Sequence, residues 1–163
     1  MVNYYTKSFN KISINRELKI KLLKAFFHLS KPEITLMVLI STWFGFYAGV
    51  VKLEQSISDF DSMFILALIL GAIFSSCGVA ALNEYIESDL DKLMDRTKNR
   101  PIPSGAISSK TGLVFGIIMS LFGIGFFWFL VHKGAAILSA LTLILYIFVY
   151  TPLKRRTPLN TLV

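Results

Sequence analysis

An acidic segment is the part of this sequence whose residue types and spacing are best suited to chemistry. Residues 83–105 read NEYIESDLDKLMDRTKNRPIPSG and hold five of the chain's ten acidic residues. If the segment starts as a helix, Asn83, Glu87 and Asp91 recur every four positions and share one face, with Glu84 beside them. The spacing therefore predicts an acidic stripe along one side of a helix.

The ligand chemistry of this stripe indicates magnesium. Carboxylate and amide oxygens are hard ligands that suit Mg²⁺, which commonly bridges protein to phosphate oxygens. The segment contains no cysteine or histidine, which disfavours zinc. On an ideal helix Asp95 would extend the stripe by another turn, whereas Asp89 would point away from it.

A run of basic residues follows the stripe and indicates phosphate binding. Arg96, Lys98 and Arg100 precede PIPSG, whose prolines and glycine are expected to end the helix and start a loop. Arginine pairs with phosphate oxygens through two parallel hydrogen bonds, so acids holding Mg²⁺ beside these bases would together bind a diphosphate. The residues alone are equally compatible with a solvated loop whose opposite charges pair weakly across helical turns.

The elements that must position this segment are membrane spans. Hydrophobic residues make up 54% of the chain and charged residues 17%, and the mean hydropathy is +0.62. Four apolar stretches approach the roughly 20 helical residues that cross a bilayer: 34–51, 63–82, 111–131 and 135–150. Because lipid offers no partner for an unpaired backbone group, each stretch is expected to be helical. The sequence therefore predicts an all-α, polytopic transmembrane bundle.

The distribution of basic residues predicts the orientation. A net charge of +7 would suit nucleic acid, but the bases follow the positive-inside rule, so no nucleic-acid partner is expected. Residues 1–33 carry seven Lys or Arg against two acids, and residues 52–62 carry one base against three acids. An N-terminus in the cytoplasm places residues 83–110 and the basic cluster 154–156 on that side too.

The segment before the first span has amphipathic character. Residues 18–29, LKIKLLKAFFHL, place lysines and apolar residues at helical spacing, as in an interfacial helix on the lipid surface. The next four residues, SKPE, offer an N-cap at Ser30 and a proline near the first turn of the span. We therefore expect residues 1–33 to form a cytoplasmic N-terminal segment.

The acidic segment resembles the first aspartate-rich motif of the UbiA superfamily of intramembrane prenyltransferases, N-D-x-x-D-x-x-x-D followed by R-P-(L/I)-P-x-G. DLDKLMDRT, YTPLKRRTPLNTLV and the Lys31–Pro32 pair resemble most closely its haem-farnesylating branch, the protoheme IX farnesyltransferases. Glu84 and Glu87 stand where the pattern has aspartate, which keeps the charge and adds a methylene. Glu33 stands where the family often has arginine, and it is not assigned to the site.

The resemblance implies a larger domain than these residues make up. Members of the superfamily have about nine helices of membrane-spanning length and a second aspartate-rich motif, whereas this chain has about four such stretches and one motif. Residues 34–163 are therefore expected to correspond to the N-terminal half of a UbiA-type domain. A fragment or truncated product is the expected explanation.

The resemblance also implies an activity: transfer of a farnesyl group from farnesyl diphosphate to a vinyl group of haem b, giving haem O, with Mg²⁺ assisting departure of the diphosphate. It implies catalytic roles for Asn83, Glu87 and Asp91. The metal ligands that it implies are Asn83, Glu84, Glu87 and Asp91. The substrate-binding residues that it implies are Arg96, Lys98, Arg100, Tyr150 and Lys154.

Two other functions stay open from the sequence. One is prenylation of an aromatic acid in quinone biosynthesis, and the other is a non-catalytic, truncated membrane protein. The aromatic run at residues 122–129, FGIGFFWF, is compatible with a prenyl channel or with packing against lipid, and Gly123 and Gly125 are expected to permit close helix contact. The resemblance further implies a bacterial inner-membrane location and an association with terminal-oxidase assembly factors.

Overall fold

The computed structural model describes residues 17–151 and residue 153, and these residues form helices and turns without a strand. A helix over residues 17–29 comes first. The elements that follow are α2 (Pro32–Lys52), the 3₁₀ turn η1 (Ile57–Asp59), α3 (Ser62–Asp91), α4 (Ser109–Phe126), the π-helical η2 (Phe127–Val131), α5 (Lys133–Ile144) and the π-helical η3 (Leu145–Tyr150). The prediction of an all-α chain is confirmed.

Four of these helical segments are long and apolar enough to cross a bilayer. Within the described residues they are Pro32–Lys52, Ser62–Asp91, Ser109–Val131 and Lys133–Tyr150, so α4 continues through η2 and α5 through η3. All four contain the predicted stretches and extend them by one or more residues. The largest extension is in α3, which reaches Asp91 and therefore carries the acidic stripe as a continuation of a membrane span.

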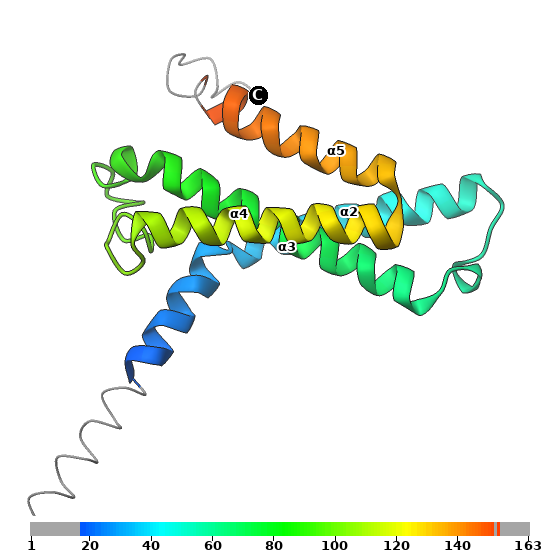
Figure 1. Ribbon diagram of the computed structural model, residues 1–163, viewed down its shortest axis with the longest axis horizontal. Helices are drawn as coiled ribbons and strands as arrows, with labels where there is room; N and C mark the ends of the chain where they lie inside the picture. The colour runs from blue at the N-terminus through cyan, green and yellow to red at the C-terminus, as the bar shows by residue number, and fades with distance from the viewer. Residues whose placement is uncertain (1–16, 152, 154–163) are drawn as a thin grey trace, which may run out of the picture.

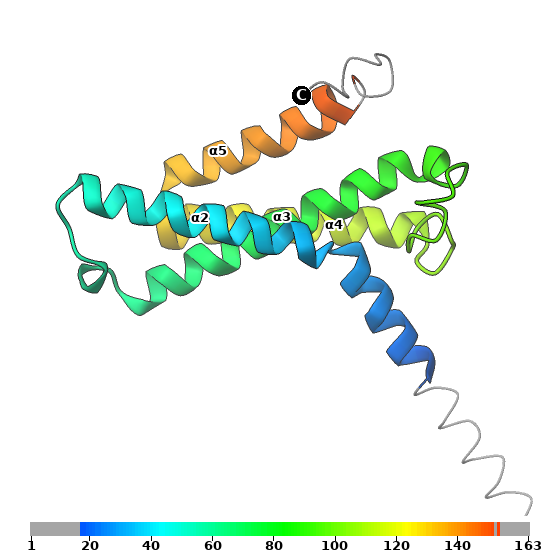
Figure 2. The ribbon, with the colours of Figure 1, turned by 180° about the vertical axis from the view of Figure 1, so that it is seen from behind.

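The helices form a bundle around α3. The ribbon shows α4 running along α3, α2 crossing α3 on another side, and α5 folding back from the end of α4 (Figure 1). The reverse view shows α2 in front of the α3–α4 pair (Figure 2). The helix over residues 17–29 leaves the bundle at an angle, at the end where α3 stops and α4 starts.

Small residues bring α3 and α4 close together. A Cβ atom added to Gly123 would lie 2.8 Å from the Cα of Ser75, and one added to Gly78 would lie 2.6 Å from the backbone nitrogen of Ser120. Glycine at such positions lets two helix backbones approach closely in lipid. The prediction for Gly123 is confirmed, but that for Gly125 is wrong, because nothing lies within 4 Å of a Cβ added there.

The start of α2 differs from the sequence prediction. Lys31, in a left-handed conformation with φ of 45°, occupies the cap position, and Pro32 begins the helix. The Ser30 hydroxyl instead donates to the carbonyl of Phe26, 3.0 Å away, so Ser30 belongs to the end of the preceding helix. Leu29 is fully buried beside Ala81, and this contact fixes the junction between the two helices.

α3 also ends earlier than predicted, because the sequence led us to expect that PIPSG, residues 101–105, would end the helix. The helix stops at Asp91, whose backbone carbonyl accepts a hydrogen bond from the Thr97 hydroxyl at 3.0 Å. That bond satisfies one of the carbonyls left unpaired at a helix C-terminus and turns the chain. Asp95 therefore does not extend the stripe: its side chain is 98% exposed and pairs with Lys98.

Candidate functional site

Three side chains of the acidic stripe share one buried face near the end of α3. Asn83 is 6% exposed, Glu87 8% and Asp91 4%. The amide nitrogen of Asn83 donates to Glu87 Oε2 over 3.0 Å. Asp89 points away from the stripe, as predicted, and its exposed side chain pairs with Lys92 at 3.1 Å. Asp89 is two positions from both Glu87 and Asp91, and residues two apart in a helix do not share a face.

An ion pair closes the end of the stripe. Arg100 Nη1 donates to Asp91 Oδ2 over 2.6 Å, and the Asp91 side chain is almost entirely buried. Removing one partner of such a pair leaves a buried charge uncompensated, which is far costlier than losing a surface pair. The pair therefore fixes the loop after α3 against the stripe.

Glu84 is directed at the loop. It is 1% exposed, and its Oε1 accepts a hydrogen bond from the backbone N–H of Ile102 over 2.9 Å. The loop is also bonded internally, because the Ile107 N–H donates to the Pro101 carbonyl over 2.9 Å. Glu84 thus connects α3 to the segment that begins with Arg100.

The described residues of the stripe do not form an enclosed metal site. Among the residues described, no three acidic, histidine or cysteine side chains converge as they would around an enclosed ion. Mg²⁺, however, is usually held by one or two carboxylates, with waters and substrate phosphates completing the shell. Glu87 and Asp91 supply two carboxylates and Asn83 a neighbouring amide, so the donor set fits Mg²⁺ that is also bound to a diphosphate.

Two arginines of the loop lie beside the stripe. Arg96 and Arg100 both line a crevice of about 420 Å³ beside Glu87 and Asp91, which we call the loop crevice. Both arginines also line a second crevice of about 660 Å³ that includes Lys31, the mouth crevice.

One predicted substrate-binding lysine, Lys98, is not brought to this site. Lys98 is half exposed and pairs with Asp95 over 2.7 Å, and it lines neither the loop crevice nor the mouth crevice. Lys154 lies outside the described residues. Among the residues that the structure describes, the cationic groups that line the crevices beside the stripe are Arg96, Arg100 and Lys31.

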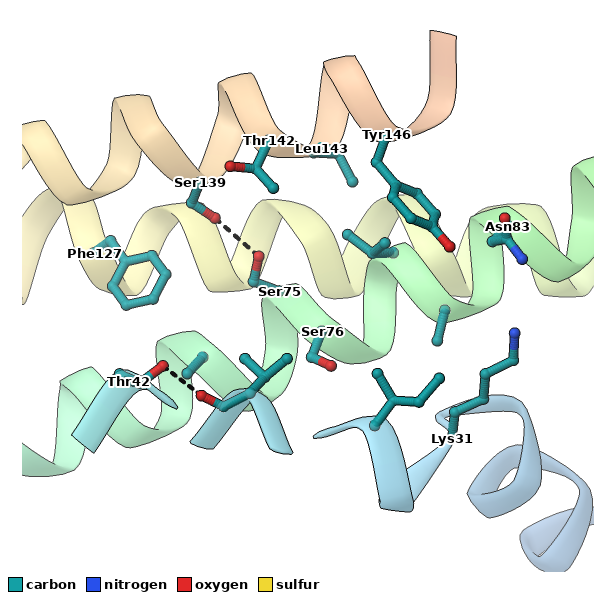
Figure 3. Close-up of a pocket in the computed structure, with 15 residues that line it drawn as sticks. Lys31, Thr42, Ser75, Ser76, Asn83, Phe127, Ser139, Thr142, Leu143 and Tyr146 are labelled. Carbon is teal, nitrogen blue, oxygen red and sulfur yellow. Dashed lines mark hydrogen bonds between the residues drawn. The ribbon is translucent and has the colours of Figure 1, made fainter. Parts of the chain in front are cut away.

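An apolar cavity adjoins the stripe. This interhelical cavity, of about 470 Å³, lies between α2, α3 and the α5–η3 helix. Figure 3 shows Phe127 toward one end and Asn83 toward the other, with Ser75 bonded to Ser139 across the middle over 2.9 Å. In the aromatic run, Phe127 lines the cavity, whereas Phe129 is 81% exposed.

Lys31 is a site residue that the sequence reasoning did not assign. It lines both the interhelical cavity and the mouth crevice, and Figure 3 shows its amine directed toward Asn83. Burial lowers the pKa of Lys31, as does the charge of Arg100, while Glu84, Glu87 and Asp91 oppose that shift. The sequence feature that could have indicated Lys31 is the Lys31–Pro32 pair. It marks the start of the span, but it does not show which way the lysine side chain points.

Tyrosines beside the cavity also differ from the prediction. Tyr150 is 45% exposed and stacks on Tyr146, with ring centroids 5.1 Å apart. Tyr146 lines the cavity, and Figure 3 shows its hydroxyl directed toward Asn83. Thr151 is fully buried, and its hydroxyl donates to the Tyr146 carbonyl over 2.8 Å and lies 3.5 Å from Asn83 Oδ1. The structure thus brings Tyr146 and Thr151, rather than Tyr150, to the stripe.

Comparison with known proteins agrees with this architecture. The family model described as the UbiA prenyltransferase family matches residues 38–163. No solved structure matches the chain.

Curated relatives extend the match almost to the N-terminus. A protoheme IX farnesyltransferase of Solibacter usitatus is 35% identical over 86% of this chain and 49% of its own length. The mitochondrial protoheme IX farnesyltransferase of Emericella nidulans is 32% identical over 96% of this chain and 32% of its own. The chain thus spans about half, or less, of the relatives' length. The family match covers more than half of this chain and includes most of its apolar helices, so the chain is an integral membrane protein of the UbiA prenyltransferase family.

Proposed function

We propose that this chain supplies the first diphosphate-binding half of a protoheme IX farnesyltransferase, which transfers a farnesyl group from farnesyl diphosphate to a vinyl group of haem b. The observation that carries the proposal is the buried stripe of Asn83, Glu87 and Asp91, which has Arg100 at its end and an apolar cavity beside it. The names of the relatives favour haem over an aromatic acid as acceptor.

The carboxylates of Glu87 and Asp91, with the amide of Asn83, would hold Mg²⁺ at the face of α3. The ion would supply charge neutralisation at the departing diphosphate. Arg96, Arg100 and Lys31 would hold the remaining phosphate oxygens, since both crevices next to the stripe are lined by these cations. In this assignment Arg100 exchanges its bond with Asp91 for one with phosphate.

The interhelical cavity would take the allylic end of the prenyl chain. Most of its lining is apolar, and it reaches from Phe127 to the polar end at Asn83. A chamber that excludes water protects a reactive carbocation from hydrolysis. The Tyr146 hydroxyl lies at the polar end, where it can donate to a leaving diphosphate oxygen.

We assign Glu84 to the loop rather than to the metal. Its carboxylate already accepts a hydrogen bond from the Ile102 N–H. The proposed metal ligands are therefore Glu87, Asp91 and the amide of Asn83. We also propose that the N-terminus and the loop after α3 face the cytoplasm of a bacterial inner membrane, as the positive-inside rule favours.

A binding experiment tests the metal assignment. The 163-residue chain, purified in a non-ionic detergent, is titrated with farnesyl diphosphate by calorimetry with and without Mg²⁺. We expect Mg²⁺-dependent binding, weakened about tenfold or more in Asp91→Asn and in Glu87→Gln, because each loses a charged contact. Asp89→Asn is the matched control, since its carboxylate is exposed and pairs with Lys92. Undiminished Mg²⁺-dependent binding in both stripe variants would contradict the assignment.

A turnover experiment tests the acceptor. Haem b and 4-hydroxybenzoate are supplied in parallel with farnesyl diphosphate and Mg²⁺, and the products are separated by chromatography. We expect farnesylated haem only, at a low rate, because these 163 residues contain a single acidic motif. Prenylated hydroxybenzoate would contradict the haem assignment, and turnover at the rate of the Solibacter relative would contradict the need for a second motif.

A further inference from the structure

A separate basic crevice lies on the outer side of the loop that follows α3. Its volume is about 250 Å³, slightly below the range of drug-sized ligand pockets. The helix over residues 17–29 contributes Lys21, Lys24 and His28, and the loop contributes Asn99 and Ser104. None of its eight lining residues is acidic. We call it the lysine crevice.

The basic side chains share one helix face. Lys21, Lys24 and His28 are spaced by three and four residues, which places them on one stripe of the helix. Across the crevice, Asn99 and Ser104 add an amide and a hydroxyl that can donate hydrogen bonds. Together these groups offer positive charge and several donors to a single small anion, as a phosphate group requires.

The surroundings of the crevice favour a lipid phosphate over a free one. Leu23 is 70% exposed and Phe27 62%, and these two residues lie one turn apart beside the basic stripe. The helix leaves the bundle at the end where the spans α2 and α4 begin and α3 ends (Figure 1). Because these helices are of membrane-spanning length, we expect this end at the bilayer surface. An amphipathic anion at this place would therefore have its charge near the lysines and its apolar part near Leu23 and Phe27.

We propose that the lysine crevice binds the headgroup phosphate of an anionic glycerophospholipid, with the acyl chains lying along Leu23 and Phe27. The site is separate from the acidic stripe. The lysine crevice nevertheless adjoins the mouth crevice, because His28 and Asn99 line both. A bound lipid would hold the helix over residues 17–29 against the loop that positions Arg100.

Native mass spectrometry of the 163-residue chain in a non-ionic detergent tests this proposal. The probes are dioctanoyl phosphatidylglycerol, dioctanoyl phosphatidylcholine and inorganic phosphate. We expect saturable binding of phosphatidylglycerol that is weakened about 30-fold in Lys21→Gln/Lys24→Gln, since a lysine near an anionic lipid contributes about 1 kcal/mol. The control Lys19→Gln/Lys110→Gln removes two exposed lysines of the same end of the bundle and should change binding by no more than about threefold.

The outcomes separate the alternatives. Equal weakening in both double variants would mean that diffuse charge attracts the lipid, and it would overturn the site. Phosphatidylcholine binding as tightly as phosphatidylglycerol, or full displacement by inorganic phosphate, would overturn the lipid assignment. Because none of the four lysines belongs to the proposed metal or diphosphate site, farnesyl diphosphate binding should persist in both double variants and should not decide the result.

Discussion

Replacing Glu84 tests whether this buried carboxylate holds the loop or a metal ion. In the structure it is 1% exposed, and its Oε1 accepts from the Ile102 N–H over 2.9 Å. A hydrogen bond to a charged group contributes about 1.5–3 kcal/mol, and each 1.4 kcal/mol is a factor of ten in an equilibrium. Glu84→Ala should therefore accelerate exchange of the Ile102 amide hydrogen by about 10- to 140-fold if the amide exchanges through local opening.

Glu84→Gln separates the bond from the charge. The amide oxygen of glutamine can still accept from Ile102, but a neutral hydrogen bond contributes only about 0.5–1.5 kcal/mol. Exchange in this variant should lie between those of the wild type and Glu84→Ala. Glu87→Gln is the matched control on the same helix face, and we expect it to leave Ile102 exchange unchanged while weakening the binding of Mg²⁺ and diphosphate.

Hydrogen–deuterium exchange with mass spectrometry, on peptides that contain Ile102, provides the measurement. Peptides as protected in Glu84→Ala as in the wild type would contradict the role of Glu84 in holding the loop. If protection is retained and Mg²⁺-dependent binding of diphosphate is lost, Glu84 is a metal ligand, as the family motif implies. Loss of protection with Mg²⁺-dependent binding retained supports the assignment to the loop.

Two further predictions concern helix packing and pH. Gly123→Ala should destabilise the chain by about 1–3 kcal/mol, because the new Cβ would lie 2.8 Å from the Cα of Ser75. Gly125→Ala should be neutral or stabilising, because nothing lies within 4 Å of a Cβ added there. Unfolding by denaturant in detergent measures both changes, and equal effects would contradict the α3–α4 packing. Because the pKa of Lys31 is lowered from 10.5, diphosphate affinity should fall as pH rises through that lowered value, while Lys31→Arg should keep its affinity over the same range. Calorimetry at several pH values measures this, and parallel curves for the two proteins would contradict a role for Lys31.

The spans were predictable because lipid leaves an apolar stretch little choice of conformation. The four predicted stretches all lie within helices of the structure, and the differences occur at their ends. The end of α3 depends on the Thr97 hydroxyl reaching the Asp91 carbonyl, a contact that hydropathy does not encode. Gly123 and Gly125 lie in the same aromatic run, yet only Gly123 faces α3, because the crossing of two helices decides which glycine is at the contact.

The acidic stripe follows from the order of the residues alone. Asn83, Glu87 and Asp91 fall on one face through the periodicity of a single helix, which acts over a few residues and requires no knowledge of the fold. For the same reason the exposure of Asp89 followed from its position alone.

The surroundings of the stripe, in contrast, depend on how the helices pack in three dimensions. Glu84 meets Ile102 eighteen residues away, and Asn83 lies near Thr151 sixty-eight residues away. The approach of Lys31 and Tyr146 to the same place depends on how α2 and the α5–η3 helix pack against α3. Such contacts join segments distant in sequence, and their geometry is set by packing between helices, which no local pattern of residues specifies.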